Sequence, residues 1–344
     1  MPSTAPAQPP QPADQLMQFA TGYIVTAAVY SAASLGVADL LKDGPRAIPV
    51  LAAACVANED ALYRVLRALA SVGVFNEISP RVFALTPMSE LLRSDGEGSL
   101  RAMVLWMGNK MHFDTYSEMM HAIKTGETVT EKVYGASCFA YMEKNKGVSD
   151  VFNAAMTTFS RTLTPRVLEA YDFSWLDGKT LVDIGGGQGM LLTSILKQHP
   201  RVHGVVFDLG HVLDGAEARI KEAGLSSRCT TCGGDFFVSV PAADAYIMKH
   251  IIHDWNDERA ISILKNCHRA GKGKARVILV ESVLAPGNEP HFAKWVDLEM
   301  LMLPGGRERT AEEFGALFEK AGMRLIRIIP TKSPVCVLEA ERVA

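Results

Sequence analysis

The segment LVDIGGGQGM, residues 181–190, decides the fold of this chain. Aliphatic residues and Asp183 lead into three consecutive glycines, and Gly189 follows after one more residue. The residues ahead, TLVDIG, are typical of a buried strand, and those behind, MLLTSILKQHP, are typical of a helix. Glycines between a strand and a helix let the backbone approach a ligand closely at the helix N-terminus. The segment therefore predicts a ligand-binding turn.

The rest of the C-terminal two thirds repeats this alternation of strand and helix. Patterns typical of strands are VHGVVFDL, RCTTCGGDFF, DAYIMKH, ARVILVESVL, RLIRIIP and SPVCVLEA. Helical patterns lie between them in AEARIKEAG, DERAISILKNCHRAG and TAEEFGALFEKAGM. This alternation predicts an α/β fold with a mainly parallel, doubly wound, Rossmann-like sheet. In such sheets ligands bind at the carboxyl ends of the strands.

Residues 15–105 predict a separate, mainly helical domain. Apolar residues recur at threes and fours up to about residue 42, and the helical patterns IPVLAAACVA and NEDALYRVLRALASVG follow. Asn58 is a suitable N-cap for the second of these. The β patterns VFNEI and VFALT come next, on either side of a turn. Helices followed by a hairpin are the outline of a winged helix, which we interpret as a packing or dimerisation module.

A DNA-binding regulator is the alternative for a winged helix. The helix expected at 60–72 offers only Arg64 and Arg67 to read bases, whereas a groove-facing helix carries more basic and polar residues. The net charge of −3 supplies no basic surface for nucleic acid or for an acidic membrane. We therefore expect neither nucleic acid nor a membrane as a partner.

The sequence predicts no targeting segment. Its first fourteen residues, MPSTAPAQPPQPAD, predict a disordered tail and lack the basic start and apolar core of a signal peptide. No later run approaches the ~18 apolar residues of a membrane helix. Cys229 and Cys232 form a CxxC, but no second pair lies nearby to complete a zinc site. We expect reduced thiols in a cytoplasmic protein.

The spacing of the glycines indicates which ligand the turn binds. A dinucleotide turn is G-x-G-x-x-G or A, but the position that follows Gly185 and Gly187 in that pattern is Met190. Asp183 would repel a pyrophosphate, and no cluster of basic residues lies nearby to hold one. An acid suits a cationic ligand instead, such as an ammonium or a sulfonium.

Two further acids follow the next two strands. Asp208 ends the second strand, where a carboxylate can bind the hydroxyls of a ribose. Asp235 ends the third strand in GGDFF and can accept from an adenine amino group, with Phe236 or Phe237 against the ring. A glycine-rich turn, a ribose acid and an adenine acid together predict S-adenosylmethionine as the cofactor.

Three later segments carry a resemblance to a known family. They are KHIIHDWNDE at 249–258, ILVESVLAPG at 278–287 and LPGGRERT at 303–310. With the glycine turn they make residues 15–344 resemble the metal-independent O-methyltransferases of small molecules, known from plant caffeate and flavonoid enzymes and from bacterial antibiotic and phenazine biosynthesis. The resemblance implies a class I methyltransferase domain, here residues 106–344 with a helical linker and substrate pocket at 106–177. It also implies a homodimer formed through the winged-helix domain.

The resemblance further implies roles for individual residues. His253 matches the family's general base, and Glu281 and Glu308 match the acids that orient it. The expected cofactor contacts are Asp183, Gly185, Gly187, Asp208, Leu209, Asp235, Phe236, Lys249 and Ser160. The expected contacts of an aromatic acceptor are Met107, Phe113, Met156, Phe159, Asp254 and Met300.

The sequence itself also supports a catalytic role for His253. It follows a predicted strand at the ligand edge of the sheet, and acids are available to fix its tautomer. A phenol has a pKa of about 10, so a base that removes its proton would make it a nucleophile. His250 and His253 could instead be a metal pair, but no third ligand is spaced nearby in sequence. Methylation of nitrogen or carbon, or chemistry without methyl transfer, remains the alternative function.

Overall fold

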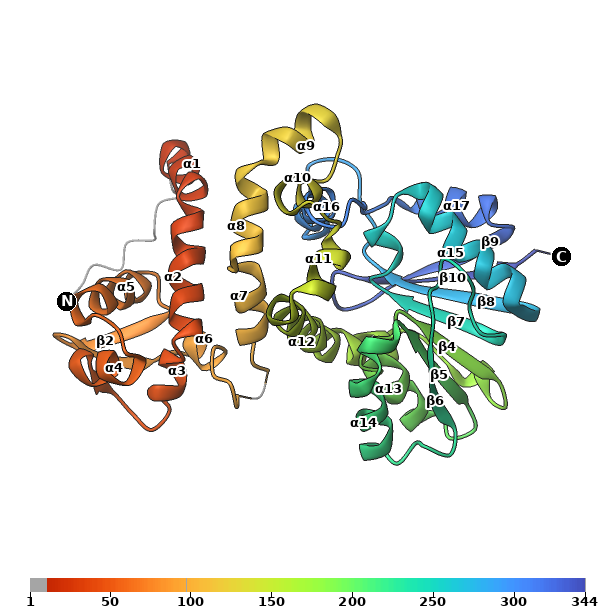
Figure 1. The fold of residues 1–344 in the computed structure, drawn as a ribbon, viewed down its shortest axis with the longest axis horizontal. Coiled ribbons are helices and arrows are strands. Elements are labelled where there is room, and N and C mark those ends of the chain that lie inside the picture. Colours follow the sequence, from red (N-terminus) through yellow and green to blue (C-terminus); the bar gives the residue numbers. More distant parts are fainter. Residues whose placement is uncertain (1–10, 97, 344) are drawn as a thin grey trace. The chain divides into compact units, whose positions relative to one another are not determined.

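The computed structural model describes residues 11–96 and 98–343 (Figure 1). The chain divides into two compact units, residues 1–113 and 114–344, and each is described by itself. The first ten residues of the predicted disordered tail lie outside the described part. Helix α1 (Pro12–Ala20) begins within the remainder of that tail, because proline is preorganised for the first helical turn.

The first unit has the winged-helix arrangement that the sequence predicts. Three short strands pair antiparallel in the order β1 (Arg46–Ala47), β3 (Val82–Leu85) and β2 (Phe75–Ser79). Asn58 caps helix α5 as expected, since its Oδ1 accepts from the amide of Ala61 at 3.0 Å. The helices are α1, α2 (Gly22–Ser34), α3 (Val37–Leu40), α4 (Ile48–Cys55), α5 (Glu59–Ser71), α6 (Pro87–Glu90) and α7 (Arg101–Met107). One apolar core contains side chains of α2, α3, α4, α5 and α7 and of strands β2 and β3.

The second unit is built around a seven-stranded sheet in the order β6-β5-β4-β7-β8-β10-β9. The five strands from β6 to β8 are parallel to one another, and β10 pairs antiparallel with both β8 and β9. The doubly wound, mainly parallel sheet is therefore confirmed. Its strands are β4 (Thr180–Ile184), β5 (His203–Asp208), β6 (Cys229–Gly233), β7 (Ala243–Lys249), β8 (Gly271–Glu281), β9 (Met323–Pro330) and β10 (Cys336–Arg342).

Helices cover both faces of this sheet (Figure 1). One apolar core contains side chains of α12 (Lys146–Ala170), α13 (Met190–Gln198) and α14 (Asp214–Glu222). The other contains side chains of α15 (Asp257–Ala270) and α17 (Ala311–Lys320). The remaining helices of this unit are α9 (Met119–Thr125), α10 (Val129–Tyr134), α11 (Cys138–Lys144) and α16 (Ala293–Met302), while α8 (Lys110–Ser117) crosses the boundary between the units.

Membrane-spanning potential is confined to one bent pair of helices. Within residues 11–96 and 98–343, no single helix has the length and apolar character needed to cross a membrane. Helices α1 and α2, which meet at a bend of 47°, satisfy the length and composition criterion only when they are taken together.

Candidate active site

The turn after β4 brings the backbone into close contact with its surroundings. Gly185, Gly187 and Gly189 have φ values of 65°, 55° and 71°, a region that side chains other than glycine rarely adopt. A Cβ on Gly185 would lie 2.4 Å from Cδ1 of Ile251. The turn between β4 and α13 therefore requires glycine for its conformation and for its space.

Asp208 holds this turn from the end of β5. Its Oδ2 accepts from the amide of Gly187 at 2.8 Å, and its Oδ1 accepts from the amide of Leu209 at 2.7 Å. Burial raises the pKa of Asp208, and the two amides partly offset that effect. The structure thus joins Asp208, Leu209 and Gly187 at one place, where carboxylate lone pairs remain for a further donor.

Asp183, which is buried, and Lys249, which is half-buried, are groups of opposite charge near the ends of β4 and β7. Asp183 is 2 % exposed, and its Oδ2 has no hydrogen-bond partner among the described residues. Burial raises the pKa of Asp183 to about 7, although Lys249 opposes the shift. Burial likewise lowers the pKa of Lys249, while Asp183 and Glu281 raise it. A cationic group bound beside Asp183 would stabilise its charged form.

Asp235 begins the turn after β6. Its Oδ1 accepts from the amide of Phe237 at 2.8 Å, so it closes its own turn, and its side chain is exposed. Phe236 and Phe237 lie with ring centroids 4.9 Å apart, and Trp255 contacts both rings. This aromatic group lies at the same edge of the sheet as Asp235, and its contact with adenine stays a prediction.

His253 lies in the turn after β7, between two buried glutamates. Its Nδ1 is 2.8 Å from Oε1 of Glu308 and 3.9 Å from Oε2 of Glu281. His253, Glu281 and Glu308 are 7 %, 0 % and 1 % exposed. Oε1 of Glu281 accepts from the amides of Ile251 and Ile252 at 3.1 and 2.9 Å, so β8 holds the histidine turn directly. In the neutral form of the ring, Nδ1 donates to Glu308, and Nε2 then carries a free lone pair.

The carboxylates change the proton affinity of this histidine. Burial alone would lower the pKa of His253, but Glu281, Asp254 and Glu308 outweigh it and raise the pKa above its ordinary value of 6.5. Oδ1 of Asp254 is 3.5 Å from Nε2. The site therefore stabilises an imidazolium, which is the form that a base acquires when it takes a proton.

The loop 303–310 between α16 and α17, called the clamp loop below, packs against the turn that carries His253, and the sequence analysis did not predict this contact. Arg309 is 0 % exposed, and its guanidinium donates to the carbonyls of Ile252 at 3.1 Å and Trp255 at 2.7 Å. It also donates to Oδ1 of Asp257 at 2.9 and 3.0 Å. Arg307 donates its amide to the carbonyl of His253 at 2.8 Å.

Gly306 lies in the same loop, directly against the histidine turn. A Cβ on Gly306 would lie 2.0 Å from the carbonyl oxygen of His253. The double glycine and the arginine that flank Glu308 in LPGGRERT were the available signal for this clamp.

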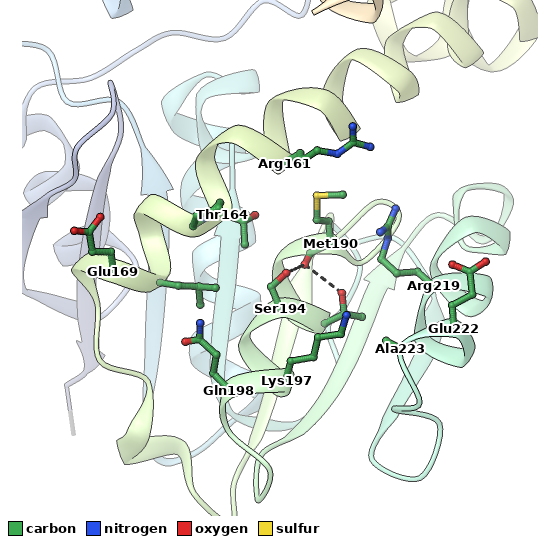
Figure 2. A pocket seen from close by; sticks show the side chains of 13 residues that line it. Arg161, Thr164, Glu169, Met190, Ser194, Lys197, Gln198, Arg219, Glu222 and Ala223 are labelled. Atoms are coloured by element: carbon green, nitrogen blue, oxygen red, sulfur yellow. Dashed lines mark hydrogen bonds between the residues drawn. The ribbon is translucent and has the colours of Figure 1, made fainter. Parts of the chain in front are cut away.

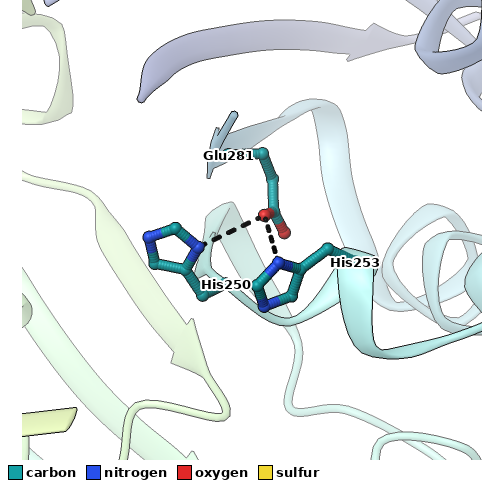
Figure 3. Close-up of side chains that lie close together, drawn as sticks. All are labelled: His250, His253 and Glu281. Carbon is teal, nitrogen blue, oxygen red and sulfur yellow. Dashed lines mark ion pairs between the residues drawn. The ribbon is translucent and has the colours of Figure 1, made fainter. Parts of the chain in front are cut away.

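His250, His253 and Glu281 form a compact group of possible metal ligands (Figure 3). One ligand atom from each lies within 4.8 Å of the others, and Oε2 of Glu281 is 3.7 Å from Nδ1 of His250. We expected no third ligand because none is spaced near the two histidines in sequence. In the folded chain, however, Glu281 at the end of β8 lies beside both histidines, so that expectation is wrong. A metal held through Nδ1 of His253 would have to displace its hydrogen bond to Glu308.

The predicted acceptor contacts divide between the two units. Phe159 contacts His250 with ring centroids 5.1 Å apart and a tilt of 37° between the rings, and Met156 precedes it by one turn of α12. Met300, near the end of α16, accepts from Gly305 and Gly306 through its carbonyl and so starts the clamp loop. Met107 and Phe113 belong to the first unit, and their contact with an acceptor stays a prediction. Ser160 is 8 % exposed in α12.

A cavity of about 770 Å³ lies between α12, α13 and α14 (Figure 2). Its walls include Arg161, Lys197 and Arg219, and none of the predicted site residues lines it. Arg219 donates from Nε to the carbonyl of Gln188, so this cavity borders the outer side of the glycine turn. The residues that line this cavity do not include His253, Glu281 or Glu308.

Two family models match the chain, one in each unit. A model described as an O-methyltransferase dimerisation domain matches residues 17–95, and one described as an O-methyltransferase domain matches residues 116–324. The chain belongs to the O-methyltransferase family. Its resemblance to that family is confirmed, as are the class I methyltransferase fold and the enzymatic activity that the sequence predicted.

Individual O-methyltransferases match over nearly the whole chain. The phenazine O-methyltransferase PhzM of Lysobacter antibioticus is 45% identical over 326 residues, which cover 94% of this chain and 95% of that protein. The crystal structure of LaPhzM aligns with a TM-score of 0.93 at 44% identity and covers 97% of this chain and 100% of that one.

A third relative was solved with ligands. It is an O-methyltransferase of neocarzinostatin biosynthesis in complex with S-adenosyl-L-homocysteine and 1,4-dihydroxy-2-naphthoic acid, and it aligns with a TM-score of 0.81 at 31% identity. The alignment covers 93% of this chain and 96% of that one.

Proposed function

We propose that this O-methyltransferase uses S-adenosylmethionine to methylate a phenolic hydroxyl of an aromatic small molecule of secondary metabolism. The observation that carries the proposal is the buried imidazole of His253, whose Nδ1 lies 2.8 Å from Glu308. The phenazine and neocarzinostatin relatives support an aromatic acceptor of this kind. We further propose that the protein is cytoplasmic.

The residues after β4 and β5 fit the proposed cofactor. The glycine turn leaves no space for a Cβ at Gly185, and Asp183 presents a buried oxygen without a partner. Asp208 presents a carboxylate that can take ribose hydroxyls as well as the amides it already accepts. An acidic, glycine-lined edge suits a positively charged nucleoside better than a pyrophosphate. When bound, S-adenosylmethionine supplies a methyl group that its sulfonium already activates.

The chain's own residues would then prepare the acceptor. His253 takes the phenol proton at Nε2 as the oxygen becomes a nucleophile, a contribution of roughly 10²–10⁴-fold. Glu308 accepts from Nδ1, which fixes the tautomer that leaves Nε2 free, and it stabilises the imidazolium with Glu281. Proton removal by His253 needs no metal ion, and we propose that catalysis is metal-independent.

Calorimetry with the purified enzyme in EDTA tests the cofactor assignment. S-adenosylmethionine and S-adenosylhomocysteine are expected to bind, and NAD is not. Asp183→Asn is expected to weaken S-adenosylmethionine about tenfold and its demethylated product less, because only the former carries the sulfonium charge. A matched control is Asp244→Asn, since Asp244 accepts from Thr180 at the opposite end of β4. Binding of NAD without either methionine derivative would overturn the proposal.

The pH profile of kcat/KM tests the role of His253. Its raised pKa keeps the free imidazole protonated up to a pH above 6.5, and a protonated base is inactive. We therefore expect kcat/KM to rise with pH along a limb whose midpoint lies above 6.5. Glu281→Gln removes a carboxylate charge 3.9 Å from Nδ1, so it is expected to lower the midpoint. Comparing electron-poor with electron-rich phenols separates ionisation of His253 from ionisation of the acceptor. A midpoint that shifts only with the pKa of the phenol would contradict the role of His253 as the base.

The dimerisation domain supports a homodimer, and we propose that α1 and α2 form its interface. Phe19, Tyr23 and Ile24 are 77 %, 63 % and 52 % exposed on these helices. Large apolar side chains gathered on neighbouring turns indicate an interaction surface. Ile24→Glu is expected to shift the enzyme from dimer to monomer in light scattering, whereas the control Val238→Glu, at a position 74 % exposed in the other unit, is not. A dimer of unchanged stability in Ile24→Glu would contradict this interface.

A further inference from the structure

His250 is a buried imidazole that the proposed reaction does not use. Its side chain is 10 % exposed, and neither ring nitrogen has a hydrogen-bond partner among the described residues. Its φ is 54°, in the left-handed region that residues other than glycine rarely adopt. Strained backbone and unpaired buried groups of this kind cluster at ligand-binding sites.

The ring of His250 is directed toward the base rather than toward the cofactor turn. It lies 4.9 Å from the ring of His253 and 5.1 Å from the ring of Phe159, measured between centroids. The next residue, Ile251, is the one whose side chain packs against Gly185. Adjacent residues of the turn therefore have different neighbours: Ile251 lies against the glycine turn, and His250 lies against His253 and Phe159.

Glu281 sets the chemical character of this imidazole. Its Oε2 is buried without a hydrogen bond and lies 3.7 Å from Nδ1 of His250 (Figure 3). A carboxylate beside Nδ1 favours the tautomer that carries the hydrogen there, which leaves Nε2 as an acceptor. Burial also lowers the pKa of His250 well below 6.5, so the ring is neutral.

We propose that Nε2 of His250 accepts a hydrogen bond from a second donor of the acceptor molecule, a hydroxyl or amino group next to the hydroxyl that is methylated. This inference rests on the proposed function, because it places the acceptor against both His250 and His253, whose rings lie side by side. The acceptor is then an ortho-diphenol or an ortho-aminophenol rather than a simple phenol. Both imidazoles present Nε2, one to take a proton and one to hold the neighbouring group in place.

The strength of this preference follows from burial. A site that contains an unpaired buried acceptor discriminates against a ligand lacking the matching donor, because the group remains unsatisfied. We expect a preference of about tenfold to a hundredfold for the ligand with the second donor.

Ligand binding to the full-length enzyme saturated with S-adenosylhomocysteine, in EDTA, tests the proposal. The probes are naphthalene-2,3-diol, 3-amino-2-naphthol, 2-naphthol and 3-methoxy-2-naphthol, which share one ring system. In the wild type the first two are expected to bind about tenfold to a hundredfold more tightly than the last two. In His250→Phe the ratio is expected to fall to about twofold for the diol, whose two hydroxyls are equivalent, and to about one for the aminonaphthol, which has a single hydroxyl. In His250→Gln the ratio is expected to be partly kept, because the amide oxygen accepts.

Phe159→Leu is the matched control, because it removes the ring that contacts His250 and leaves the imidazole itself. Its affinities are expected to change together for all four probes, with the ratio retained. Equal affinities in the wild type, no binding of any probe, or a ratio that survives in His250→Phe would each overturn the proposal. A loss of S-adenosylhomocysteine binding in His250→Phe alone would also overturn it, by assigning the ring to the cofactor. Failure of the wild type to bind S-adenosylhomocysteine would overturn the proposed function instead.

Discussion

Replacement of His253 by alanine is expected to lower kcat by roughly 10²–10⁴-fold with a simple phenol as acceptor. At neutral pH a phenol with a pKa of about 10 is almost fully protonated, so without a base its oxygen is a poor nucleophile. Steady-state kinetics with labelled cofactor measures the loss. His253→Gln is expected to lose nearly as much, because its amide can donate to Glu308 but cannot take a proton.

Two controls separate proton removal from damage to the site. His203→Ala changes a histidine at the start of β5, away from the ligand edge, and is expected to keep wild-type turnover. An electron-poor phenol that is already ionised needs no base, so its loss in His253→Ala is expected to be much smaller. Turnover of a simple phenol within a few-fold of wild type in both His253 variants would rule out the base.

The fold could be predicted because its determinants are local in sequence. The strand, glycine turn and helix at 180–198 each have their own pattern, and alternation along the chain specifies a parallel sheet. The cap at Asn58 and the capping box at Thr310 are likewise local signals that the structure contains. Helix α1 begins at Pro12, inside the segment that was expected to be a disordered tail. The high proline, alanine and glutamine content of that segment gave no sign of the helix.

The site could be predicted only in part, because its distances depend on segments far apart in sequence. That His253 lies beside Glu308 was implied by the family resemblance, but the 2.8 Å contact results from the packing of the clamp loop on the turn after β7. The approach of Glu281 to His250 arises from the register of β7 with β8, in which Lys249 pairs with Val280. Arg309 was overlooked because an arginine in a motif gives no indication that its guanidinium is buried against carbonyls.

Gly306→Ala is expected to lower kcat about 100-fold, because a displacement of about 1 Å in a catalytic group costs that much. The new Cβ would lie 2.0 Å from the carbonyl oxygen of His253, 2.3 Å from the carbonyl carbon of Asp254 and 2.6 Å from the nitrogen of Trp255. All three are backbone atoms, so no change of rotamer relieves the contact, and the clamp loop must move away from His253. Glu308 moves with it, and the hydrogen bond that fixes the tautomer of the base lengthens.

Gly315→Ala is the matched control, since nothing lies within 4 Å of a Cβ built at that position in α17. Alanine in a helix interior is expected to raise stability by about 0.5–1 kcal/mol and to leave kcat unchanged. For Gly306→Ala we expect affinity for S-adenosylhomocysteine to be largely kept, because the glycine turn after β4 is a separate segment, while kcat falls and the acidic limb of the pH profile moves toward the ordinary histidine pKa as Glu308 withdraws. Calorimetry, kinetics and thermal unfolding together distinguish this pattern from general loss of the fold, and a Gly306→Ala enzyme with wild-type kcat would mean that the clamp does not position the base.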